Sequence, residues 1–92
     1  MRQLDIGEIE EIKEVLIERN PEVIFFDDIE EALIGVGERF GAPPVALYSK
    51  QHAFQIYMEY MSYEEAEEHF GYNVIGGWVG DSTPMFADFE VF

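Results

Sequence analysis

The chain has 92 residues, of which 48% are hydrophobic, and its 20 Asp and Glu against 5 Lys and Arg give a formal net charge of -15. This length supports one hydrophobic core and predicts a single domain over residues 1–92. The charge disfavours direct binding to nucleic acid or to anionic membranes, and the absence of cysteine excludes disulfides and thiolate metal sites.

The first predicted element is an amphipathic helix over residues 5–20. Its apolar residues recur every three or four positions, as a helix with one buried face requires: Ile6, Ile9, Ile12 and Leu16. Asn20-Pro21 is expected to end it, because proline disfavours helical geometry in the residue before it.

The next segment, residues 22–26, is apolar and is either extended or the lead-in to a second helix. Asp27 or Asp28 is a suitable N-cap for that helix. A stripe of apolar residues at helical spacing continues it to residue 40: Ile29, Leu33, Val36 and Phe40. Gly41 and the prolines at 43 and 44 predict its end.

Residues 45–48 are short, apolar and bounded by proline, which predicts a buried strand. Ser49 is the expected N-cap of a further helix that reaches Met61 and carries four residues on one side: Ala53, Ile56, Tyr57 and Tyr60. Ser62 and Glu65 match a capping box, which predicts a last helix ending at Gly71.

The pattern of the C-terminal part predicts two strands, over residues 72–80 and 84–87. They are expected to form a hairpin or small sheet, with a turn at 81–84. Residues 88–92 are expected to form a tail. The predicted fold is therefore α+β, with three or four helices packed on a small sheet of two to three short strands.

Glutamates line the outer faces of two predicted helices. Glu11, Glu14 and Glu18 share a face of the first helix, and Glu64 and Glu68 share a face of the last. Because like charges three or four residues apart destabilise a helix, folding alone does not favour this spacing. Either the rows only solvate the surface, or they imitate a phosphate backbone and bind a basic, nucleic-acid-binding protein.

Aromatic residues between Tyr57 and Trp78 give a second candidate surface. Tyrosine and tryptophan are enriched at interface hot spots, so Tyr57 and Tyr60 join the candidate partner-binding residues. The alternative function is a homodimeric assembly or regulatory module that pairs through this region.

Catalytic, metal and cofactor sites are not predicted. Ser49 and Ser62 are explained as helix caps, and the glycines of residues 35–41 do not fit the spacing or charge of a phosphate loop. His52, or His69 with Glu65 one turn earlier, could supply a metal ligand pair, but catalytic zinc normally has three protein ligands. We expect a non-enzymatic protein without cofactor, and metal binding through a histidine is the alternative.

The protein is expected to be cytoplasmic. Residues 1–5 lack the apolar core of a signal peptide, and the longest uncharged run, residues 70–80, is too short to cross a bilayer.

Four segments, residues 32–41, 44–48, 61–66 and 73–80, resemble a family of short proteins from bacteriophages and prokaryotic genomes. The resemblance spans roughly residues 27–86. It implies a phage or mobile-element setting and a role as an inhibitor. The family has no assigned activity, so the resemblance assigns no role to any residue.

Overall fold

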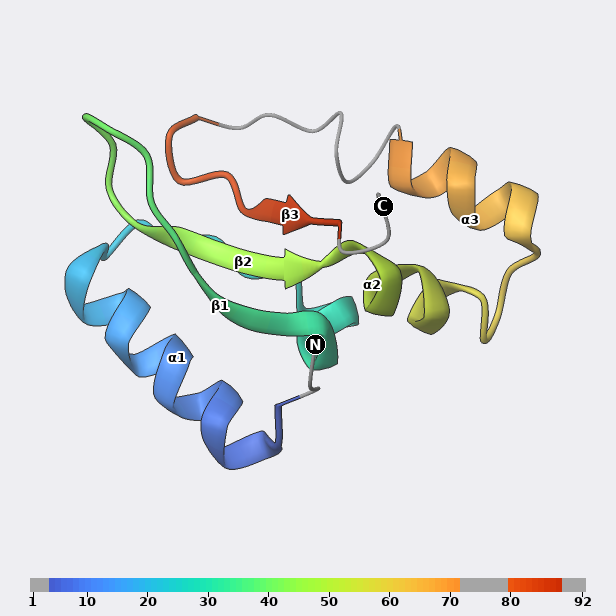
Figure 1. The fold of residues 1–92 in the computed structure, drawn as a ribbon, viewed down its shortest axis with the longest axis horizontal. Coiled ribbons are helices and arrows are strands. Elements are labelled where there is room, and N and C mark those ends of the chain that lie inside the picture. The colour runs from blue at the N-terminus through green and yellow to red at the C-terminus, as the bar shows by residue number, and fades with distance from the viewer. Residues whose placement is uncertain (1–3, 72–79, 89–92) are drawn as a thin grey trace.

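A computed structural model describes residues 4–71 and 80–88 (Figure 1). Within these ranges the chain forms α1 (Ile6–Arg19), the 3-10 helix η1 (Asp27–Ala32), α2 (Lys50–Tyr57) and α3 (Tyr63–His69). The strands are β1 (Leu33–Gly37), β2 (Val45–Ser49) and β3 (Met85–Ala87). The predicted α+β class, with helices on a small three-stranded sheet, is confirmed.

Helix α1 forms where the sequence predicts it. Asp5 is its N-cap and makes a capping box with Glu8, and the backbone becomes extended at Asn20. Ile9 and Leu16 are buried, whereas Ile6 is 80% exposed and does not join the inner face.

The prediction of a helix over residues 29–40 is wrong. Only η1 is helical, and the chain then continues as strand β1, while Phe40 has no buried surface. Ile34 and Val36 are β-branched and alternate with Gly35 and Gly37, which suits a pleated strand better than a helix. Pairing with β2 supplies the hydrogen bonds that hold this conformation.

The sheet has the order β1-β2-β3, with β1 and β2 antiparallel and β2 and β3 parallel. The strand predictions for residues 45–48 and 84–87 are confirmed to within one residue. The strand predicted over residues 72–80 lies, apart from Gly80, outside the described residues, as do residues 89–92 of the predicted tail.

The caps of α2 and α3 match their predictions. Ser49 accepts a hydrogen bond from the His52 amide, and Ser62 forms a capping box with Glu65. Helix α2 ends at Tyr57 instead of Met61, and residues 58–60 form a turn.

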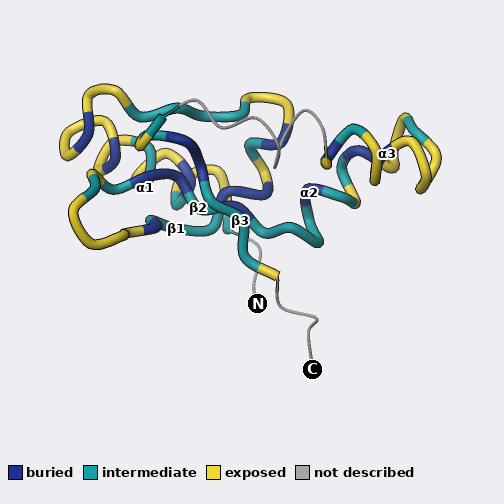
Figure 2. The backbone as a smooth tube through the Cα atoms, turned by 90° about the horizontal axis from the view of Figure 1, so that it is seen from above, coloured by how far each residue is buried: buried dark blue, intermediate teal, exposed yellow. Residues whose placement is uncertain are grey.

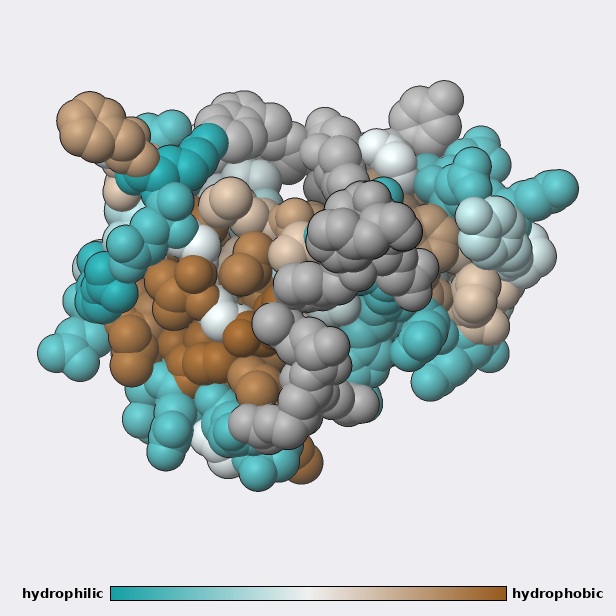
Figure 3. All heavy atoms as spheres, in the orientation of Figure 1, coloured by the Kyte–Doolittle hydropathy of each residue, from teal (hydrophilic) through white to brown (hydrophobic). Residues whose placement is uncertain are grey.

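One face of the sheet packs on the helices to form the core, which includes Leu16, Leu33 and Tyr48 (Figure 2). On the other face Leu47 and Met85 are paired neighbours that stay partly exposed. Figure 3 shows apolar side chains gathered over this part of the molecule, with hydrophilic side chains around them.

Candidate binding surfaces

The outer face of α1 is a row of carboxylates. Glu11, Glu14 and Glu18 are all exposed, on the side of the helix opposite the buried Ile9 and Leu16. With Glu10 included, four charges follow about 12 Å of helix axis, or roughly one every 4 Å. A single strand of duplex DNA carries one charge per about 3.4 Å, so the row has a similar linear charge density.

The basic residues of α1 do not neutralise this row. Lys13 pairs with Glu30, and Arg19 pairs with Glu38 at 2.9 Å. Among the described residues no ion pair reaches Glu11, Glu14 or Glu18. Within the described residues no basic neighbour therefore offsets the three carboxylates.

The second predicted row, Glu64 and Glu68, is exposed on α3. Figures 1 and 2 both show α1 and α3 at opposite ends of the molecule, whose longest dimension is 37 Å. The structure therefore does not bring the two predicted rows together into one band. Each row is a separate acidic surface.

The two candidate tyrosines differ in position. Tyr57 is 1% exposed, and its hydroxyl donates a hydrogen bond to Asp28 at 3.3 Å. Burial, with the nearby Asp28 carboxylate, raises the pKa of Tyr57. Its assignment to a partner surface is corrected, because its ring belongs to the core. Tyr60 is 64% exposed, and its ring makes a T-shaped contact with that of Tyr57.

The histidines do not take part in a metal-binding cluster within the described residues. His69 packs edge-on against Tyr57, with ring centroids 4.8 Å apart, and His52 lies in the first turn of α2. No group of three His, Asp or Glu residues is arranged to hold a metal ion in residues 4–71 and 80–88.

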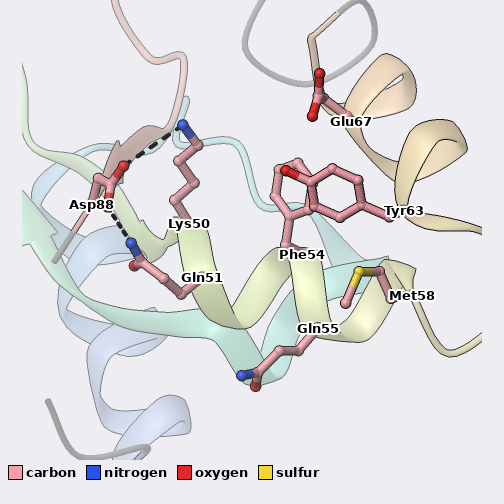
Figure 4. A pocket seen from close by; sticks show the side chains of 8 residues that line it. All are labelled: Lys50, Gln51, Phe54, Gln55, Met58, Tyr63, Glu67 and Asp88. Atoms are coloured by element: carbon pink, nitrogen blue, oxygen red, sulfur yellow. Dashed lines mark hydrogen bonds and ion pairs between the residues drawn. The ribbon is translucent and has the colours of Figure 1, made fainter. Parts of the chain in front are cut away.

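A pocket between α2 and α3 was not predicted from the sequence (Figure 4). Its volume is about 460 Å³, within the range usual for ligand sites. Phe54 and Met58 line it from α2 and its C-terminal turn, and Tyr63 and Glu67 line it from α3. The two residues of each pair are four positions apart, so each pair shares a helix face. This spacing is the sequence signal from which the pocket could have been predicted.

Comparison of the chain with protein-family models, with curated proteins and with solved structures gives no match. In the part of the chain that the structure describes, no helix has both the length and the apolar character needed to cross a membrane.

Proposed function

We propose that this protein is a non-catalytic acidic binding protein that uses the outer face of α1 to occupy a basic surface of a nucleic-acid-binding protein. The observation that supports the proposal is the row of Glu11, Glu14 and Glu18, exposed and without a basic partner among the described residues. A phage-encoded inhibitor acting in the cytoplasm fits this role.

The energetics of α1 favour this proposal over a purely solvating surface. Glu11 and Glu14 are three residues apart and Glu14 and Glu18 four, and each such pair costs about 0.2–0.5 kcal/mol. A solvating surface could distribute its charge without these repulsive spacings. A basic partner relieves the repulsion on binding, so the same spacing contributes to association.

Apolar residues flank the carboxylate row. Val15 is 45% exposed and Ile17 is 54% exposed, on the two sides of the row. Protein interfaces combine such apolar contacts with charges that orient the partner. A protein surface with basic and apolar groups is therefore a better match than a small polyamine.

Two matched variants test the proposal. Glu11→Gln/Glu18→Gln removes two charges from α1, and Glu64→Gln/Glu68→Gln removes the same charge from α3. Each immobilised protein is exposed to a nuclease-treated bacterial lysate at low salt, and bound proteins are identified by mass spectrometry. We expect the wild type and the α3 variant to retain a nucleic-acid-binding protein that the α1 variant does not retain. Duplex DNA should displace this protein from the wild type and from the α3 variant.

Two results would contradict the proposal. One is that no nucleic-acid-binding protein is retained at low salt. The other is equal loss from both variants, which would show that net charge alone governs retention. Light scattering on the purified proteins tests the alternative function, a homodimeric module. A dimer that is insensitive to salt and is disrupted by Tyr60→Ala would favour self-association through the exposed Tyr60.

A further inference from the structure

The pocket between α2 and α3 combines aromatic, aliphatic and charged groups in one place. The rings of Phe54 and Tyr63 lie side by side, with centroids 6.0 Å apart and planes tilted by 40°. Figure 4 shows Met58 beside these rings and Glu67 on the neighbouring turn of α3. Tyr63 is 62% exposed and Met58 is 43% exposed, so the pocket is open to a ligand.

The charges around the pocket are unequal at its two ends. Lys50 Nζ lies 3.7 Å from the Asp88 carboxylate, and Gln51 also bonds to Asp88, so this end is largely neutralised. At the other end the nearby Glu67 carboxylate raises the pKa of the Tyr63 hydroxyl. The net charge of the lining is therefore negative, and it is concentrated beside the aromatic rings.

We propose that this pocket binds an arginine side chain presented by a partner protein. The inference rests on the proposed function in one respect, that the partner is basic, but it concerns a different surface from α1. The guanidinium would stack on the ring of Tyr63 or Phe54 and donate hydrogen bonds to Glu67. Its aliphatic stem would pack against Met58.

Arginine is favoured over other ligands for two reasons. A planar guanidinium can stack on a ring and bond to a carboxylate in the same pose, which a compact ammonium does less well. An anionic ligand would be repelled by Glu67, and a purely apolar one would gain nothing from that carboxylate.

The test uses the full chain and a blocked Gly-Arg-Gly peptide, followed by NMR of the side-chain signals of Phe54, Tyr63 and Met58. Peptides with citrulline or lysine in place of arginine are the controls, since citrulline keeps the shape of arginine without its charge. We expect saturable shifts with a Kd on the order of 1 mM for the arginine peptide. The lysine peptide should bind several-fold more weakly, and the citrulline peptide should give no saturable shift.

Two variants on the same helix separate the pocket from the overall charge. Glu67→Gln should weaken the arginine peptide about tenfold, because a charge-assisted hydrogen bond is lost. Glu68→Gln removes the same charge outside the pocket lining and should change the affinity less than about twofold. Both residues are exposed, so both variants are expected to fold.

Equal binding of the arginine and citrulline peptides, or equal effects of Glu67→Gln and Glu68→Gln, would overturn the pocket assignment. Neither result would bear on the α1 surface, which the lysate experiment tests with different residues. Conversely, a saturable arginine site that persists in Glu11→Gln/Glu18→Gln would support the pocket even if the α1 proposal failed.

Discussion

At the scale of single residues, buried polar groups join distant parts of the chain. The Tyr48 hydroxyl accepts a hydrogen bond from the Phe26 amide at 2.8 Å, and burial raises the pKa of Tyr48 to about 12. Asn20 reaches both the Pro44 carbonyl and the Ser82 hydroxyl through its side-chain amide. The two Asn20 bonds connect the end of α1 with the loop before β2 and the turn before β3.

Tyr48→Phe is predicted to destabilise the protein by about 1–3 kcal/mol, because the Phe26 amide would lose its acceptor in a partly buried position. The measurement is urea unfolding followed by circular dichroism. Tyr60→Phe is the control, since that side chain is 64% exposed and should change stability by less than about 0.5 kcal/mol. Equal effects would mean that the Tyr48 hydroxyl is not a structural acceptor.

The two glycines of β1 give a second prediction, because their surroundings differ. A Cβ at Gly35 would meet no atom within 4 Å, whereas a Cβ at Gly37 would lie 2.8 Å from Met85 Sδ. Neither glycine has a positive φ. Gly35→Ala should therefore stabilise the protein by about 0.4–1 kcal/mol, because it reduces the entropy of the unfolded chain.

Gly37→Ala should not give this increase in stability, because the Met85 side chain must move to make room for the new Cβ. Thermal unfolding of both variants measures the difference, and a Tm for Gly37→Ala equal to or above that of Gly35→Ala would contradict the prediction.

At the scale of elements, α3 depends strongly on its N-terminal cap because it has only seven residues. Ser62→Ala is predicted to cost about 1 kcal/mol and to reduce helicity at α3, whereas Ser62→Asp retains a capping oxygen and should preserve the helix. Amide hydrogen exchange of residues 65–69 measures this directly. Unchanged protection in Ser62→Ala would show that packing alone holds α3.

The same capping box makes α3 sensitive to acid. Hydrogen bonds from Ser62 lower the pKa of Glu65 below its ordinary value of 4.5. A carboxyl with a lowered folded-state pKa stabilises the fold above its unfolded pKa, and this stability is lost as the pH falls through the folded-state value. Protection of α3 should therefore decrease below about pH 4.5 in the wild type, with a smaller change in Ser62→Ala.

The elements that could be predicted are those whose signals are local. The caps at Ser49 and Ser62 are set by residues within one turn, so sequence reasoning placed both helix starts. Strand β1 was missed because its apolar spacing, from Ile29 to Phe40, also fits a helix. Pairing with residues 45–48 decides between the two, and this contact depends on a hairpin that spacing does not reveal.

The candidate site shows the same division. Exposure of Glu11, Glu14 and Glu18 follows from their position opposite Ile9 and Leu16 on a regular helix, and the structure agrees. Tyr57 and Tyr60 were predicted together, three residues apart on one helix. Because α2 ends at Tyr57, the chain turns and Tyr60 faces outward, so the two residues separate.

At the scale of the whole molecule, the sequence could not place the two acidic helices relative to each other. That arrangement depends on packing around the sheet, and α1 and α3 lie at opposite ends. A partner of ordinary interface size would therefore meet one acidic surface at a time. The net charge of -15 acts mainly between neighbouring charges, because exposed charges farther apart than the Debye length of roughly 10 Å are largely screened.

The last prediction concerns Glu14, which has a glutamate on each side at repulsive spacing. Glu14→Gln removes three unfavourable pairs, with Glu10, Glu11 and Glu18, and should stabilise the protein by about 0.6–1.5 kcal/mol at low salt. The gain should shrink in about 0.5 M NaCl, where the Debye length falls below about 5 Å, while the wild type itself becomes more stable. Thermal unfolding at the two salt concentrations measures both effects.

If α1 is the binding surface, the same substitution should weaken partner retention while it stabilises the fold. A binding loss caused by misfolding would be accompanied by a lower Tm, so opposite signs separate function from folding. Glu64→Gln is the matched control on α3 and should leave retention unchanged. Retention that stays constant in Glu14→Gln, together with a higher Tm, would mean that the row only solvates the surface.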